Sequence, residues 1–199
     1  MTDTAVPRRP IGFAVFLIVA GVIGWFAAFS LTVEKFHLLT NPGEALSCDF
    51  SLLVQCKANL ESPQGSIFGF PNPILGLTGW VAPIVVGAAL LAGARFSRWF
   101  WIIFNIGVAG ALVLVIWLIS QSLFVLSTLC PWCMVTWAAT IPLFWAVTLR
   151  NLGAGVIPLP ERARRFFQAA FGWTPALTIV SYLAVALTAQ IALDVVSYL

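Results

Sequence analysis

Five long apolar segments, none with a charged residue, constrain this chain more than any other feature of its sequence. Each can cross about 30 Å of hydrocarbon as a helix that rises roughly 1.5 Å per residue. Sheets with open edges leave backbone groups unsatisfied in lipid, and these runs lack the alternation of barrel strands, so we predict helices. The predicted spans are approximately Ile11–Val33, Ile74–Ala94, Trp99–Leu123, Pro131–Leu149 and Trp173–Leu193.

Composition agrees with a membrane protein. Only 9% of the residues are charged, whereas soluble domains usually carry about 25%. The first apolar run is too long for the core of a signal peptide and has no small-residue cleavage site, so we expect a retained span. No basic stripe suited to nucleic acid is present.

Arginine and lysine residues divide unevenly between the two sides of the five predicted spans. One side carries only Lys35 and Lys57. Because positive residues favour the cytoplasm, we predict a multi-pass membrane protein with a cytoplasmic N-terminus and an extracytoplasmic C-terminus. The predicted cytoplasmic side carries Arg8, Arg9, Arg95, Arg98, Arg150, Arg162, Arg164 and Arg165.

The polar segments complete the predicted single membrane domain of residues 1–199. Residues 34–73 form an outer loop that is longer than a simple connection needs, which indicates a function. Asp49 in this loop is expected to be a solvated residue. Residues 150–172 form a cytoplasmic linker, in which Glu161–Phe171 is predicted to be a short basic amphipathic helix.

All four cysteines fall on the predicted outer side. Cys48 and Cys56 lie in the loop, and Cys130 and Cys133 form a C-P-W-C motif where the fourth span begins. An even number of cysteines on the oxidising side of a membrane indicates disulfide chemistry. With Cys130 as helix cap and Pro131 as first helical residue, the two sulfurs of the motif come within bonding range, and the helix dipole favours a thiolate.

Three interpretations of these cysteines remain open. They form structural disulfides, or a four-cysteine zinc site, or two pairs that exchange disulfides. The C-x7-C spacing of the loop pair is unusual for zinc ribbons. Exchange requires an electron acceptor, and the sequence has no nucleotide fingerprint, no haem-binding C-x-x-C-H and no histidine in a span. A lipid-soluble quinone is the simplest acceptor left.

Taken together, these motifs resemble the vitamin K epoxide reductase family, and in particular its bacterial homologues. The resemblance rests on Cys48, Cys56, the stretch S-P-Q-G-S-I-F-G-F-P-N-P at residues 62–73 and the C-P-W-C motif, and it covers the first four spans. It implies an all-α integral membrane fold, in which a four-helix bundle surrounds a quinone under a capping outer loop. The fifth span suits the bacterial topology, so the resemblance implies a bacterial plasma-membrane protein.

The resemblance also implies roles for the cysteines. Cys48 takes electrons from a partner and passes them to Cys56, which exchanges with Cys130, and Cys133 then reacts with the quinone. That quinone is a menaquinone, a ubiquinone or a vitamin K-like molecule, and no metal is involved.

Three further residues match quinone-contacting positions of the family. Asn72 matches an asparagine before the second span, and Ser62 matches a serine after the second loop cysteine. Trp137 replaces a tyrosine and offers an indole N–H in place of a hydroxyl. Without the resemblance, Asn72 is a turn residue before Pro73 and Ser62 is a helix cap before Pro63.

The predicted function is that of a membrane thiol:quinone oxidoreductase. It reoxidises a thioredoxin-like disulfide-forming partner, which is expected to be a separate protein because no such domain follows the fifth span. One alternative is a vitamin K epoxide or quinone reductase. Another is a non-catalytic membrane scaffold whose disulfides brace the outer loop.

Overall fold

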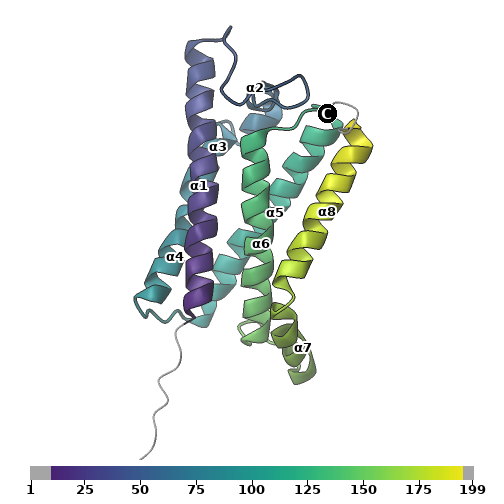
Figure 1. Cartoon of the computed structure of the whole chain (residues 1–199). Helices are drawn as coiled ribbons and strands as arrows, with labels where there is room; N and C mark the ends of the chain where they lie inside the picture. Colours follow the sequence, from purple (N-terminus) through teal and green to yellow (C-terminus); the bar gives the residue numbers. More distant parts are fainter. Residues whose placement is uncertain (1–9, 195–199) are drawn as a thin grey trace, which may run out of the picture.

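The computed structural model describes residues 10–194, and this part of the chain is helical, without a strand. Five helical segments are long and apolar enough to cross a membrane, which confirms the predicted all-α membrane fold. They are α1 (Ile11–Thr40), α3 with α4 (Asn72–Gly79 and Val81–Leu91), α5 (Arg98–Phe124), α6 (Pro131–Gly153) and α8 (Thr174–Leu193) (Figure 1).

Four of these segments form a bundle, and the fifth lies outside it. The α4 helix packs along α1, α6 packs on both α1 and α5, and α8 lies against α6 and α5 (Figure 1). Three short elements complete the described part: α2 (Lys57–Glu61) and the 3-10 helix η1 (Pro63–Ser66) at one end, and the amphipathic α7 (Glu161–Phe171) at the other. The α7 helix has the bounds that the sequence predicts.

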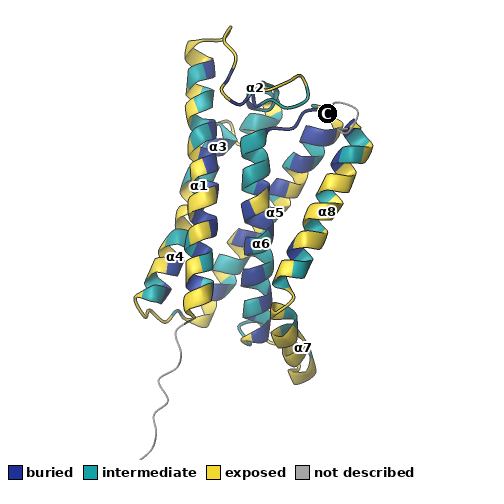
Figure 2. Cartoon of the chain, in the orientation of Figure 1, coloured by how far each residue is buried: buried dark blue, intermediate teal, exposed yellow. Residues whose placement is uncertain are grey.

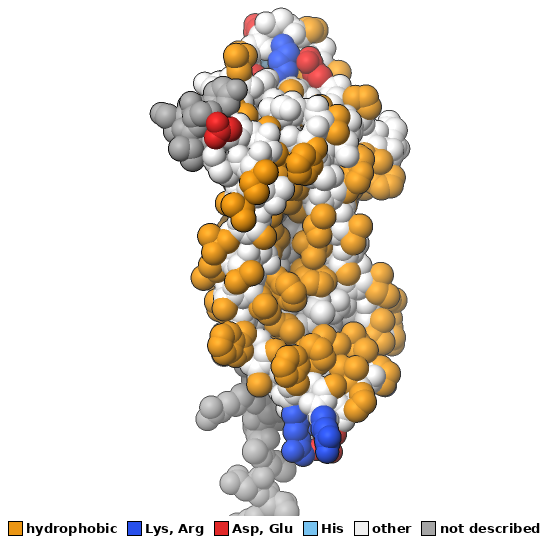
Figure 3. Space-filling model, turned by 90° about the vertical axis from the view of Figure 1, so that its right-hand side faces the viewer, with side chains coloured by type: hydrophobic (Ala, Val, Ile, Leu, Met, Phe, Trp, Pro, Cys, Tyr) orange, Lys and Arg blue, Asp and Glu red, His pale blue; other side chains and the backbone are white. Residues whose placement is uncertain are grey.

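The surface of the bundle is apolar where lipid would touch it. Exposed residues follow the outward faces of the long helices (Figure 2). Hydrophobic side chains cover the middle of the molecule, whereas Lys and Arg side chains gather at its lower end (Figure 3). Arg8 and Arg9, which contribute to the predicted orientation, lie outside the described residues.

Small residues and one proline set the arrangement of α1, α3 and α4. A Cβ atom on Gly24 would lie 2.2 Å from the ring of Trp80, so only glycine lets this indole pack against α1. Pro83 has no N–H for the carbonyl of Gly79, and its ring crowds that carbonyl. The helix is accordingly interrupted at Trp80, between α3 and α4.

The first helix is longer than its apolar run, so the outer loop is shorter than predicted. The sequence places the start of the loop at Glu34, but α1 continues to Thr40. Two contacts support the extension: Leu38 is buried among loop residues, and Lys35 Nζ donates a hydrogen bond to the carbonyl oxygen of Leu60 at 2.7 Å. Tertiary packing therefore holds a polar helical turn that hydropathy assigns to a loop.

A proline inside α6 frees a backbone carbonyl that accepts a hydrogen bond from α8. Pro142 lacks an N–H, which leaves the carbonyl of Ala138 without its helical donor. The hydroxyl of Tyr182 on α8 donates a hydrogen bond to this carbonyl at 2.5 Å. Because a backbone carbonyl in lipid needs a partner, this contact helps to hold the fifth helix against the bundle.

We expect Tyr182→Phe to lower the free energy of unfolding by about 1 kcal/mol, because the Ala138 carbonyl loses its donor. In a Pro142→Ala background the residue at position 142 supplies its own N–H, so the same substitution should cost less. Unfolding of the four proteins in detergent measures this coupling. Equal losses in both backgrounds would show that the hydroxyl does not serve the carbonyl freed by Pro142.

Candidate functional site

The four cysteines meet at one end of the bundle. Cys48 and Cys56 form a disulfide with their Cα atoms 5.8 Å apart, and Cys130 and Cys133 are free thiols. The sulfurs of Cys56 and Cys130 are 3.5 Å apart. Cys56 and Cys130 are 0% exposed and Cys48 is 2% exposed, so this contact is closed to water. A sulfur pair at this distance can exchange a disulfide bond.

The start of α6 supports a thiolate at Cys130. Cys130 caps the helix with an extended backbone, Pro131 is the first helical residue, and the Cys130 sulfur accepts a hydrogen bond from the backbone N–H of Cys133 at 3.4 Å. The Cys133 thiol, with the backbone N–H groups of Cys133 and Trp132, holds the pKa of Cys130 below its ordinary value despite burial. The predicted cap is thus confirmed, and such a thiolate is a good leaving group.

A short backbone pairing brings the loop pair to α6. Leu129, directly before Cys130, donates its N–H to Leu53 at 2.7 Å and accepts one from Gln55 at 3.0 Å. Val54 and Leu129 form a parallel β-bridge. These bonds fix the segment before Cys56 alongside the segment before Cys130, so the two sulfurs face each other although they are 74 residues apart in sequence.

Asp49 holds the loop together, and its expected role as a solvated residue is wrong. Its Oδ1 accepts hydrogen bonds from the backbone N–H groups of Cys56 at 2.8 Å and Lys57 at 3.2 Å, and its Oδ2 accepts one from Leu46 at 3.1 Å. The carboxylate thereby caps α2 and joins both sides of the disulfide. Its position next to a cysteine in a turn-forming segment was the available signal, since Asp commonly bonds nearby backbone in this way.

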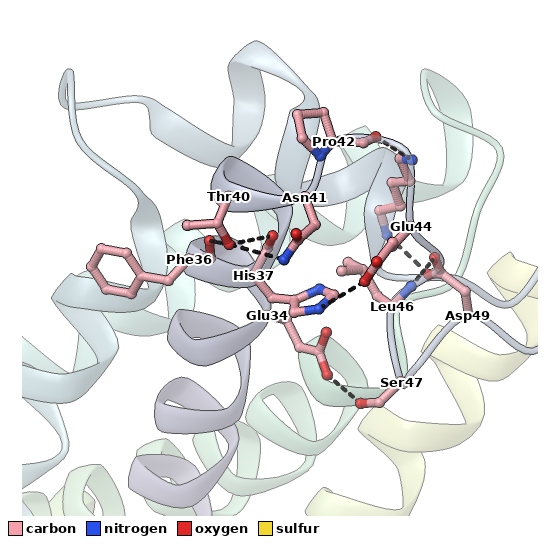
Figure 4. A network of polar contacts seen from close by, with 11 residues as sticks. Glu34, Phe36, His37, Thr40, Asn41, Pro42, Glu44, Leu46, Ser47 and Asp49 are labelled. Carbon is pink, nitrogen blue, oxygen red and sulfur yellow. Dashed lines mark hydrogen bonds and ion pairs between the residues drawn. The ribbon is translucent and has the colours of Figure 1, made fainter.

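The extended end of α1 anchors the other side of the loop (Figure 4). The Ser47 hydroxyl donates to Glu34, and His37 Nε2 lies 3.2 Å from a carboxylate oxygen of Glu44. Lys57 Nζ donates to the carbonyl oxygen of Pro42 at 3.2 Å. The segment that carries Cys48 is therefore held on α1 rather than moving freely.

A large cavity opens beside the cysteines. It has a volume of about 900 Å³ and lies between α3–α4 on one side and α5 and α6 on the other. Cys133 lines it, as do Ser62, Asn72 and Trp137. The structure thus brings all three further sequence-predicted residues to the same space as one sulfur of the α6 pair.

These three residues differ in their free hydrogen-bonding capacity. The Ser62 hydroxyl donates to the carbonyl of Asn59 at 2.8 Å and accepts from the N–H of Gly65, so it caps η1. The Asn72 amide donates to the carbonyl of Gln64 at 2.7 Å and accepts from the N–H of Ile67. Trp137 is buried, and within residues 10–194 its indole N–H donates to no protein group.

The described residues contain no group of three or more histidine, cysteine, aspartate or glutamate side chains placed to hold a metal ion. Within residues 10–194, the cysteine geometry is that of one disulfide beside two thiols. It does not resemble a four-cysteine zinc site, which requires four thiolates around one point.

A protein-family model matches a large part of the chain. Residues 15–148, more than half of the chain, match the model of the vitamin K epoxide reductase family. The matched region contains the disulfide, the C-P-W-C motif and every predicted cavity residue. No curated protein matches the chain.

We expect Asp49→Ala to loosen the loop, because three backbone N–H groups lose a charged acceptor. The free energy of local opening around Cys56 should fall by roughly 1–3 kcal/mol. Hydrogen exchange of a peptide covering residues 46–60 measures this change. Glu44→Ala, which removes the contact to His37 instead, is the control. Unchanged protection in Asp49→Ala would show that the carboxylate does not organise the loop.

We also expect Cys56 and Cys130 to bond directly when they are the only cysteines present. In Cys48→Ala/Cys133→Ala, mild oxidation should give one intramolecular disulfide, detected by non-reducing peptide mapping. The matched control Cys56→Ala/Cys130→Ala leaves Cys48 and Cys133 and should oxidise far more slowly. Similar rates for the two proteins would argue against a preferred contact between Cys56 and Cys130.

Proposed function

Because this chain belongs to the vitamin K epoxide reductase family and is a membrane oxidoreductase, we propose that it oxidises the thiols of a protein partner and reduces a membrane quinone. The observation that carries the proposal is the 3.5 Å approach of the Cys56 and Cys130 sulfurs, next to a cavity that Cys133 lines. Disulfide chemistry can thereby be coupled to a lipid-soluble acceptor.

The transfer between the cysteine pairs is two successive thiol–disulfide exchanges. When the loop pair is reduced and the α6 pair oxidised, the Cys56 thiolate attacks the Cys130 sulfur and Cys133 leaves as a thiolate. Cys48 then attacks Cys56, which forms the loop disulfide and releases Cys130. Two electrons have moved from the loop to α6, and the products match the arrangement of bonded loop and free α6 thiols.

The cycle closes when Cys130 and Cys133 form their own disulfide. This step releases two electrons and two protons, and a quinone accepts both to become a quinol. The pKa of Cys130 is lowered by its contacts at the helix start, which favours its release as a thiolate when Cys48 attacks Cys56. The closed packing around Cys56 and Cys130 keeps water and outside thiols away from the sulfurs.

The residues that line the cavity suit the binding of a quinone. Most of its lining residues are apolar, and the polar ones include Ser62, Asn72 and the unpaired indole N–H of Trp137. A donor near a quinone carbonyl stabilises the charge that develops there on reduction. We assign this role to Trp137, with the remaining amide hydrogen of Asn72 as a second donor, while Ser62 shapes the loop that covers the site.

The placement of charge supports an orientation for the protein, and that orientation limits which partners can reach the cysteines. The α6 helix begins at Cys130 and carries Arg150 in its last turn, and Arg98 at the start of α5 donates a hydrogen bond to the carbonyl of Val156 just beyond that end. The positive-inside rule therefore favours the extracytoplasmic side for the cysteines. There the electron donor is a thioredoxin-like dithiol protein that reacts at Cys48. A non-catalytic scaffold gives no reason for two free thiols beside a disulfide and a cavity.

An anaerobic titration tests the proposal. Protein reduced with a dithiol and then freed of it is mixed with a short-chain ubiquinone or menaquinone, and quinone absorbance and thiol content are followed together. We expect one quinol for each pair of thiols lost, and a rate reduced by at least about 10³-fold in Cys133→Ser, because no second sulfur can complete the disulfide.

Met134→Leu, at the neighbouring position, is the control and should react like the original protein. Quinone reduction by Cys133→Ser at the original rate would overturn the proposal, as would loss of thiols without quinol. The same mixture with vitamin K epoxide in place of quinone tests the epoxide reductase alternative, since both substrates draw electrons from the same thiols.

A further inference from the structure

The cavity contains a pair of glutamines to which the family resemblance assigns no role, although Gln64 lies within the stretch of residues 62–73 on which the resemblance rests. Gln64 on η1 and Gln121 near the end of α5 both line the cavity, and Gln64 Nε2 donates to Gln121 Oε1 at 3.4 Å. The Gln64 Oε1 atom is itself closed to solvent and has no hydrogen-bond partner; among residues 10–194 no other side-chain nitrogen or oxygen atom that is itself closed to solvent lacks one. An unpaired buried amide oxygen is costly, which indicates that another group completes this site.

The other polar residues that line the cavity are mostly occupied. Ser62 donates to Asn59, and Thr136 and Thr140 donate to carbonyls of their own helix. In the described part of the chain, by contrast, the Gln121 amide nitrogen donates to no protein group. The free N–H groups at the cavity therefore include those of Gln121, the indoles of Trp80 and Trp137 and the remaining amide hydrogen of Asn72, whereas Gln64 Oε1 is the acceptor that is closed to solvent without a partner.

The surrounding structure holds Gln64 in place. Asn72 donates to the backbone carbonyl of Gln64, and Ser62 caps the single turn of η1 on which Gln64 lies. Gln121 is fixed because its carbonyl accepts N–H groups from Val125 and Leu126 at the end of α5. Two rigid elements thus present the amides to the cavity from different sides.

We infer that Gln64 and Gln121 form a head-group site that binds both the oxidised and the reduced form of the acceptor, an inference that rests on the proposed function. A quinone carbonyl only accepts hydrogen bonds, whereas a quinol hydroxyl also donates one. An amide side chain serves both, because half a turn about its last torsion exchanges its N–H groups for its carbonyl. The Gln121 N–H groups bind the quinone carbonyl, and the unpaired Gln64 oxygen accepts the quinol hydroxyl.

Near-isosteric substitutions test the pair. Gln64→Met and Gln121→Met keep the length and bulk of the side chain but remove the amide. The matched control is Gln55→Met, because Gln55 lies in the outer loop and its amide donates to the carbonyl of Leu52. With a short-chain ubiquinone as the probe, we expect KM to rise roughly 3- to 10-fold in each cavity variant. The inhibition constant of the corresponding quinol should rise similarly, and most in Gln64→Met.

A third readout separates this site from the relay. Reduction of the Cys130–Cys133 disulfide by a dithiol, without quinone, should proceed at the original rate in both cavity variants. Values of KM and of quinol inhibition within twofold of the original protein, or an equal rise in Gln55→Met, would overturn the inference. Failure of the proposed function looks different, because the unsubstituted protein would then not reduce ubiquinone at all.

Discussion

The contact between the sulfurs of Cys56 and Cys130 depends on one small piece of backbone pairing. Leu129 exchanges hydrogen bonds with Leu53 and Gln55, and this pairing fixes the loop against the start of α6. Asp49 then binds the backbone on both sides of the loop disulfide. Without these bonds little would hold two sulfurs 3.5 Å apart when their residues are separated by 74 positions in the sequence.

The membrane helices contribute the α6 thiols and enclose the cavity. The start of α6 stabilises a thiolate at Cys130, and one turn later Cys133 lines the cavity that α3–α4, α5 and α6 enclose. The start of α6 therefore holds Cys130 in a closed, protein-lined space and Cys133 at the wall of an apolar cavity of about 900 Å³. In our proposal, electrons enter through the loop and leave through this cavity, and no metal is needed for either step.

Much of this arrangement could be predicted from the sequence, because it follows from local signals. Charge-free runs predicted the spans, and the proline after Cys130 predicted the helix start. The extension of α1 could not be predicted, since Leu38 and Lys35 are held by contacts with a distant loop. The Gln64–Gln121 pair was missed for the same reason, because its two residues are 57 positions apart in the sequence. The partners of Asp49 are local, so its role could have been predicted from its position in a turn-forming segment.

The central claim is that electrons pass from the loop to α6 through a bond between Cys56 and Cys130. The most direct test is to supply the protein with a reduced thioredoxin-like partner and a quinone, quench samples with acid and an alkylating agent during turnover, and map the disulfides. The proposed transfer predicts three disulfides: Cys48–Cys56, a transient Cys56–Cys130 and Cys130–Cys133. Sustained quinone reduction in which a bond between Cys56 and Cys130 never forms would contradict it.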